Sequence, residues 1–307
     1  MPRNATAGLD GSPESLAAAD WAAREALLRD MPLRLVHARE WEPYAYAPLG
    51  GVSVPRSVSD AHRDWAEHMP REAESRLARR YPGLRIGTDS MAEKPVPALL
   101  AAAEDAEVLV LGSRGLNGVT GFLLGSVALA VVARTARPVV LVRAGERAVD
   151  EHLPDGAGVA STATPYRDVV LGLDLRNPDD KVIEFAFDAA SRRAANLRVL
   201  HGWSLPVSSR GYGGIVDPEF DAELTARVRQ ELSDVLRPWR TKFPGVEVNE
   251  QTVIGGAGSH LVDASWDAAL VVVGRRTRNV QFGTHIGPVT HAVLHHATAP
   301  VAVVPHD

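Results

Sequence analysis

The sequence contains one series of short motifs twice, and this duplication constrains the fold more than any other feature. The first two motifs recur 164 residues later and the remaining three recur 162 residues later, always in the same order. Such regular recurrence indicates two copies of one structural unit. The matched pairs are Gly8–Asp10 with Gly172–Asp174, Leu33–Ala38 with Leu197–Gly202, Tyr81–Leu84 with Phe243–Val246, Val108–Gly112 with Leu270–Gly274, and Pro138–Val142 with Pro300–Val304.

The duplication divides the 307 residues into two domains of ordinary size. We expect a first domain at 1–147 and a second at 165–307. Between them, residues 148–164 are rich in Gly, Pro, Asp and Ser, which is typical of a linker.

Short β-branched runs alternate with helical patterns in each half, which indicates α/β domains with parallel sheets. Right-handed crossovers and five strands allow a doubly wound, Rossmann-like sheet of order 3-2-1-4-5 in each domain. This order reverses between strands 1 and 4, and ligands bind beyond the carboxyl ends of strands at such a reversal. In the first half we expect strands at 5–10, 33–39, 84–90, 107–112 and 138–143.

Helix starts are signalled at equivalent places after the first strand of each half. Ser12 followed by Pro13 predicts an N-cap and a first helical residue, and Asn177 followed by Pro178 predicts the same start in the second half. Long loops are expected after the second strands, at 41–58 and 203–217.

A glycine-rich stretch, 112–126, leaves the predicted fourth strand and enters a helix. Gly112, Gly115 and Gly125 are separated by two and nine residues, and Ser126 follows. Glycines adopt positive φ easily and admit close backbone approach, while a helix N-terminus presents N–H groups and a positive dipole. The stretch therefore predicts a polyphosphate cradle without a lysine. The alternative is a surface loop with Ser126 as the helix cap.

Asp10 ends the first strand beside that stretch. Its carboxylate could accept hydrogen bonds from an adenine amino group or a ribose hydroxyl, although Asp followed by Gly is also a strong turn signal. An acidic group next to an anion cradle favours a nucleotide over free phosphate.

Composition excludes several classes of protein. There is no cysteine, so disulfides and thiolate sites are impossible, and no lysine follows a glycine, so a Walker A loop is absent. Neither G-x-G-x-x-G nor G-x-S-x-G occurs. The net charge of −5 gives no general attraction to nucleic acid or anionic membranes. No apolar run is long enough to span a bilayer and no secretory signal is evident, so we expect a cytoplasmic protein.

These motifs resemble those of the universal stress protein family in its tandem form, over essentially the whole chain. The resemblance implies an α/β fold, binding of ATP with little or no catalysis, dimeric pairing of domains and a role in stress survival; Mg²⁺ is expected with the phosphates. By this resemblance Gly8, Asp10 and Ala38 would surround the adenine and ribose, and Leu111, Gly112, Gly115, Gly125, Ser126 and Val127 would line the phosphates.

The second half keeps the spacing but changes the residues. Asp174, Gly274 and Gly287 match the pattern, whereas Thr277 replaces the second glycine and Pro288 replaces the serine. Proline has neither a hydroxyl nor an N–H to donate, so we expect one ATP per chain, held by the first domain. Arg275 and Arg276 either compensate through charge or form a solvated rim.

The histidines carry less information. His37 and His201 occupy equivalent strand positions and are expected to be packed, hydrogen-bonded side chains. His291 and His295 lie one helical turn apart, but no third metal ligand is assignable, so a solvated or partner-facing helix is favoured.

The sequence thus predicts an ATP-binding universal stress protein that acts as a nucleotide-responsive regulatory or interaction module. Two alternatives remain open: a slow ATPase or nucleotide-dependent transferase, and a scaffold with two degenerate pockets. The last strands, 138–143 and 300–305, are expected to pair into an internal pseudo-dimer, because pairing removes exposed strand edges. A homodimer of the whole chain is a further expectation.

Overall fold

The chain folds into two compact units, the first ending at Glu146 and the second beginning at Arg147. A computed structural model describes residues 3–38, 56–113, 125–204, 218–277 and 286–307, and for 56–67 and 218–221 it describes the backbone alone. No helix in these ranges combines the length and apolar character needed to cross a membrane.

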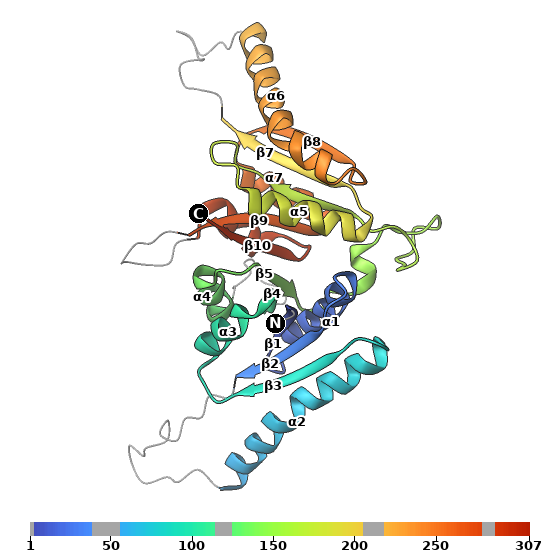
Figure 1. Cartoon of the computed structure of the whole chain (residues 1–307), viewed down its shortest axis with the longest axis vertical. Coiled ribbons are helices and arrows are strands. Elements are labelled where there is room, and N and C mark those ends of the chain that lie inside the picture. Colours follow the sequence, from blue (N-terminus) through green and yellow to red (C-terminus); the bar gives the residue numbers. More distant parts are fainter. Residues whose placement is uncertain (1–2, 39–55, 114–124, 205–217, 278–285) are drawn as a thin grey trace. The chain divides into compact units, whose positions relative to one another are not determined.

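The first unit is a parallel sheet covered by helices on both faces (Figure 1). Strand β1 lies between β2 and β4, β3 flanks β2, and β5 flanks β4, so the order is β3-β2-β1-β4-β5. Helices α1 and α2 contact each other on one face, and α3 and α4 contact each other on the opposite face. The elements are β1 (Asn4–Leu9), α1 (Pro13–Leu28), β2 (Leu33–Ala38), α2 (Arg56–Arg80), β3 (Ile86–Met91), α3 (Pro95–Glu104), β4 (Ala106–Ser113), α4 (Ser126–Arg134) and β5 (Val139–Arg143).

The second unit repeats this architecture. Strand β6 lies between β7 and β9, with β8 beyond β7 and β10 beyond β9, and all described pairs are parallel. Two short 3-10 helices, η1 (Ala148–Glu151) and η3 (Ser265–Asp267), have no equivalent in the first unit's described residues. The other elements are β6 (Asp168–Gly172), α5 (Asp180–Arg193), β7 (Leu197–Trp203), α6 (Pro218–Lys242), β8 (Val248–Ile254), α7 (Ala257–Ala264), β9 (Ala268–Arg276), α8 (Pro288–His296) and β10 (Val301–His306).

The central strands are buried on both faces, which is why they are continuously apolar. In β4 the consecutive residues Leu109 and Val110 have no exposed surface, although their side chains point to opposite faces. Val271 and Val272 of β9 are equally buried. The α/β class with a parallel sheet in each half is therefore confirmed.

One of the two predicted helix starts is correct. Ser12 is the N-cap of α1 and its hydroxyl accepts from the Ser15 N–H, with Pro13 as the first helical residue. The prediction at Asn177 is wrong, because α5 begins at Asp180 with Asp179 as its N-cap. The Asp179 carboxylate accepts from the Lys181 and Val182 N–H groups, so the cap forms two residues further along the chain.

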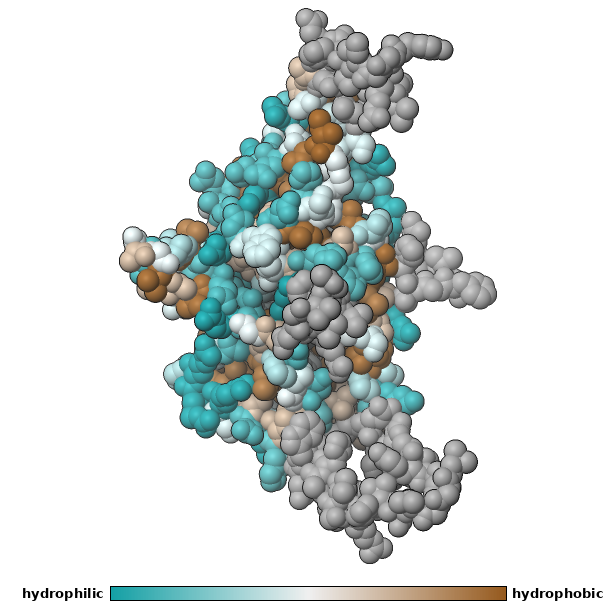
Figure 2. Space-filling model, turned by 180° about the vertical axis from the view of Figure 1, so that it is seen from behind, coloured by the Kyte–Doolittle hydropathy of each residue, from teal (hydrophilic) through white to brown (hydrophobic). Residues whose placement is uncertain are grey.

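The segment expected as a linker has structure of its own and belongs to the second unit. Glu151 forms an almost fully buried ion pair with Arg193, at 3.8 Å between Nη2 and Oε2. The ring of His152 packs on the ring of Tyr166, and the Arg193 guanidinium also lies over the Tyr166 ring. Two isolated antiparallel bridges lie within residues 152–166, which form an arm that projects from the second unit. Leu153 and Val159 of this arm are exposed, and hydrophobic atoms are visible on it in Figure 2.

Helix α1 lies close to the sheet at Gly112, near the end of β4. A Cβ added to Gly112 would lie 2.6 Å from the Glu14 carbonyl carbon and 2.7 Å from the Ser15 nitrogen. Both are backbone atoms, which cannot swing aside as the end of a side chain can. Only glycine therefore fits between β4 and the first turn of α1.

We predict that Gly112→Ala lowers the free energy of unfolding of the first unit by about 1–3 kcal/mol, because the added methyl overpacks this contact. Denaturant titration followed by circular dichroism measures the effect. Gly87→Ala is the matched control, since a Cβ at Gly87 in β3 meets nothing within 4 Å. Equal midpoints for the two variants would contradict the packing explanation.

Candidate functional site

In both units the candidate site lies where two central parallel strands end side by side. β1 pairs with β4, with Ala7 opposite Val110, and β6 pairs with β9, with Gly172 opposite Val273. Because these strands run in the same direction, the loops that follow them meet at one edge of the sheet. In the first unit this edge carries Asp10 after β1 and Gly112 near the end of β4.

The two strand-1 aspartates occupy the same kind of turn. Asp10 is exposed, and its Oδ1 accepts from the Ser12 N–H at 3.0 Å and the Ser12 hydroxyl at 2.5 Å. Asp174 is also exposed, and its Oδ1 accepts from the Arg176 N–H at 3.1 Å. Each carboxylate thus orders the loop after its strand through one oxygen. This turn role accompanies the binding role that the sequence suggested.

The strand glycines have a packing reason of their own. A Cβ at Gly8 would lie 2.7 Å from a methyl of Leu111 and 2.9 Å from a methyl of Leu99. Its counterpart Gly172 would meet Leu261 at 2.7 Å. These glycines let α3 and α7 pack against the sheet. Ala38, at the end of β2, is half-buried near the same edge.

Helix α4 begins at this edge of the first unit. The chain enters it through Gly125, the N-cap, so Ser126 is the first helical residue and the alternative of Ser126 as the cap is wrong. The first internal bond runs from the Leu129 N–H to the Gly125 carbonyl, and the N–H groups of Ser126 and Val127 precede it. Gly125 has φ −59, so no positive φ requires glycine there. Gly115 lies outside the described residues.

The second unit starts the corresponding helix differently. Gly287 is the N-cap of α8 and Pro288 occupies the first helical position, where a missing N–H does not weaken the helix. The Thr290 hydroxyl donates to the carbonyl of Gly274 at 2.9 Å, which ties the helix to β9. Fewer N–H groups therefore point toward the loop region than in α4.

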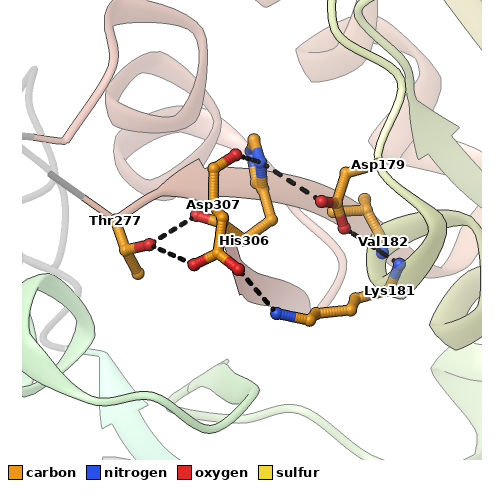
Figure 3. Close-up of polar contacts among 6 residues, drawn as sticks. All are labelled: Asp179, Lys181, Val182, Thr277, His306 and Asp307. Atoms are coloured by element: carbon orange, nitrogen blue, oxygen red, sulfur yellow. Dashed lines mark hydrogen bonds and ion pairs between the residues drawn. The ribbon is translucent and has the colours of Figure 1, made fainter.

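Thr277 takes part in a polar cluster that joins α5, β9 and β10 (Figure 3). Its N–H and its hydroxyl both donate to the His306 carbonyl, at 2.6 and 2.8 Å, and the hydroxyl lies 3.1 Å from Asp307 Oδ1. Lys181 donates to Asp307 Oδ2, and its hydrogen bond, with that of Thr277, lowers the pKa of Asp307. His306 Nδ1 lies 3.8 Å from Asp179 Oδ2. Thr277, which stands where the first half has Gly115, thus stabilises the fold of the second unit.

A cavity of about 700 Å³ lies at the same edge of the second unit. The three residues predicted there, Asp174, Gly274 and Gly287, all line it. His306 also lines it, beside Gly274, whose added Cβ would lie 2.8 Å from the His306 ring. The sequence interpretation missed His306; the available signal was that the duplication aligns it with Ala144.

Helix α5 starts later at this cavity than α1 does at the corresponding edge of the first unit. In the first unit the first turn of α1 covers Gly112. In the second unit α5 begins later relative to the repeat, and the His306 ring and Val182 lie against Gly274 instead. Side chains thus replace a helical turn at the edge of the sheet.

Arg275 is not part of a solvated rim, which corrects that expectation. It is 5% exposed, and burial lowers the pKa of its guanidinium, whereas Arg276 is exposed. Strand geometry explains the difference, because successive side chains of β9 point to opposite faces. Both arginines line the cavity.

The strand histidines are packed as predicted. His37 and His201 are buried, and their Nδ1 atoms lie 2.9 and 2.8 Å from the Leu9 and Leu173 carbonyl oxygens. The rings of His291 and His295 have centroids 4.2 Å apart. Within the described ranges, no three His, Asp or Glu side chains gather as metal ligands.

Comparison with known proteins gives consistent matches along both halves. The family model described as the universal stress protein family matches residues 1–143 and again 165–305. Universal stress protein Rv2005c of Mycobacterium tuberculosis is 31% identical over 312 residues, which cover 96% of this chain and 95% of the relative. Universal stress protein Rv2623 of the same species is 32% identical over 301 residues, with 96% and 94% covered.

A solved structure shows the same fold. The crystal structure of a universal stress protein from Archaeoglobus fulgidus aligns with a TM-score of 0.67 and 16% identity, covering 99% of this chain and 98% of the other. The two tandem matches and the full-length relatives lead to one conclusion: the chain belongs to the universal stress protein family.

Proposed function

We propose that this protein binds ATP, together with Mg²⁺, in its first unit and acts in the cytoplasm as a nucleotide-responsive regulatory or interaction module in stress response. The observation that carries the proposal is the start of α4 at the carboxyl edge of β4. Its first N–H groups, from Ser126 onward, precede the first internal helix bond and can donate to phosphate oxygens. Asp10, after the neighbouring β1, supplies the carboxylate for the sugar or base.

The other residues assigned to this nucleotide lie around the same edge. Ala38 ends β2, and Gly8 and Leu111 pack together near the ends of β1 and β4. Gly112 admits the first turn of α1, which places the Asp10 turn beside the end of β4. With Gly115, Gly125, Ser126 and Val127 they form the proposed site. In this site a Mg²⁺ ion, and not a lysine, would neutralise the phosphates.

A binding role fits this edge better than rapid catalysis. Asp10, the carboxylate assigned to the sugar or base, accepts two hydrogen bonds from Ser12 at Oδ1, which orient it toward the turn. Efficient hydrolysis needs a general base within reach of the attacking water, whereas the role proposed for Asp10 is to bind the sugar or base. We therefore assign slow hydrolysis at most.

The residues that distinguish the two helix starts, Ser126 and Pro288, can be exchanged. Ser126→Pro should weaken ATP affinity by about tenfold or more, because one N–H and one hydroxyl are lost and each such bond to a charged group contributes about 1.5–3 kcal/mol. Proline is tolerated at a first helical position, so the fold should persist. Isothermal titration calorimetry with Mg²⁺ and ATP measures the affinity. Pro288→Ser is the matched control and should leave the first site unchanged; equal affinity in Ser126→Pro would contradict the phosphate assignment.

We also predict the stoichiometry of ATP binding. Calorimetry of the intact chain with Mg²⁺ and ATP should give close to one site per chain, because Pro288 and Thr277 replace cradle residues in the second unit. Gly115→Val should abolish this site, and Thr277→Val should leave it almost unaltered. Two equal sites, or one site lost through Thr277→Val, would reverse the assignment.

We also propose that the units pair through their last strands as an internal pseudo-dimer, and that whole chains form homodimers. Within its unit β5 pairs with β4, and β10 pairs with β9, so each strand has one further edge available. Both strands are short and apolar. Pairing two such edges would satisfy their outward N–H and C=O groups.

Hydrogen exchange provides the test of this pairing. Amides that point outward from β5 and β10 should exchange slowly, at rates similar to those of the inward amides, because both sets would be hydrogen-bonded. The outer edge strands β3 and β8 are the internal controls and should show alternating fast and slow amides. The same alternation in β5 and β10 would rule the pairing out.

A further inference from the structure

Helix α8 of the second unit carries two histidines on one face. His291 and His295 lie four residues apart, so their side chains are neighbours on the helix surface. Their ring centroids are 4.2 Å apart, and the ring planes are tilted by 33°. His291 is exposed and His295 is half-buried, so solvent reaches the pair from the side of His291.

Packing holds the backbone that carries this pair. Val293 and Leu294 of α8 are buried, and the Ala297 N–H closes the last turn on the Val293 carbonyl. Helix α7 lies against α8, because a Cβ added to Gly258 would be 3.2 Å from the Cβ of Ala292. The spacing of the two imidazoles is therefore set by a regular helix that is anchored in the unit.

The first unit has apolar side chains at the corresponding positions. Under the offset of 162 residues, Leu129 of α4 aligns with His291 and Ala133 aligns with His295. Leu129 is half-buried and Ala133 is buried. Leucine and alanine thus satisfy the packing of this helix in the first unit, so packing alone does not explain two imidazoles in the second.

Two imidazoles one helical turn apart can chelate a metal ion. Imidazole nitrogen suits zinc, nickel and copper, and zinc–nitrogen distances are about 2.0–2.1 Å. A small rotation of the exposed His291 ring lets both rings offer a nitrogen to one ion, since their centroids are only 4.2 Å apart. Burial, together with the nearby His295 and His296, lowers the pKa of His291, which favours the neutral form that binds metals.

The position along the helix also favours a cation. His295 lies in the last turn of α8, at the negative end of the helix dipole. Among the residues that the structure describes, no group of three His, Asp or Glu side chains gathers as ligands, so water would complete the coordination shell. Hard cations such as Mg²⁺ and Ca²⁺ prefer oxygen ligands and do not suit this pair.

We propose that His291 and His295 form a chelating site for a divalent transition-metal ion of the zinc, nickel and copper group. This site goes beyond the proposed function, because it lies on a helix of the second unit and takes a different cation from the Mg²⁺ expected with ATP. A bound ion would link two successive turns of α8 and stabilise the helix.

Isothermal titration calorimetry of the full-length protein, without an affinity tag, tests the proposal with Zn²⁺, Ni²⁺ and Cu²⁺ in a buffer that does not bind metals. At least one of these ions should bind at one such site per chain, more tightly than Mg²⁺. His291→Leu and His295→Ala each install the first unit's residue and should weaken this binding by about tenfold or more, because one of two ligands is lost. His296→Arg also installs the first unit's residue but keeps both ligands; as the matched control it should leave the affinity almost unchanged.

Thermal unfolding provides a second readout. An ion that binds only the folded helix should raise the Tm of the wild-type protein and of His296→Arg, and should not raise that of His291→Leu. Because His291 is exposed, this variant keeps the test decisive if His295→Ala fails to fold.

Three outcomes would overturn the proposal: no binding of any of the three ions, binding no tighter than that of Mg²⁺, or binding unchanged by His291→Leu, which would place the ion at other histidines. Titration with Mg²⁺ and ATP separates this site from the proposed function. His291→Leu should leave ATP affinity intact, and Ser126→Pro should leave transition-metal binding intact, so either proposal can fail alone.

Discussion

The atoms that pack over Gly112 in β4 and over Gly274 in β9 shape the two candidate sites. In the first unit, backbone atoms of Glu14 and Ser15 leave no room for a side chain on Gly112. The helix therefore starts early, and the Asp10 turn is short. In the second unit the His306 ring and Val182 lie against Gly274, and a longer loop precedes α5. A side chain can be replaced or moved more easily than a helical turn, so the second site tolerates changes in its lining better than the first.

The differences between the units form a consistent set. Thr277 and Pro288 remove features suited to a phosphate chain, and the hydroxyl of Thr277 instead ties β9 to the end of β10. Arg176 and Arg275 add charge at positions where the first unit has serines. Duplication makes such change possible, because one copy can retain an inherited role while the other acquires new contacts within the same sheet topology.

Sequence reasoning predicted the features that local patterns encode. The duplication, the parallel α/β class, the N-cap at Ser12 and the packed His37 and His201 are all confirmed. Membership of the universal stress protein family, inferred from the glycine spacing and strand motifs, is also confirmed. These signals depend on residues close in sequence or on a pattern that repeats.

Other features depend on tertiary contacts and were not predictable. Asn177 and Asp179 are both good caps, and only the contacts of the folded loop select Asp179. The depth of Arg275 depends on which face of β9 it occupies and on what packs there. The composition of 148–164 suggested a linker because it is rich in Gly, Pro, Asp and Ser, yet Glu151 finds its partner, Arg193, more than forty residues away along the chain.

The buried pair of Glu151 and Arg193 determines where a second half that folds by itself must begin. The family match resumes at residue 165, but Glu151 and Arg193 are nearly solvent-free, with side chains 2% and 1% exposed. Cutting the chain at 165 would remove the carboxylate and keep the guanidinium, and breaking a buried pair from one side costs about 3–5 kcal/mol. An autonomous second half therefore has to start upstream of η1, near Arg147. The start of the family match and the start of the folding unit therefore lie almost twenty residues apart.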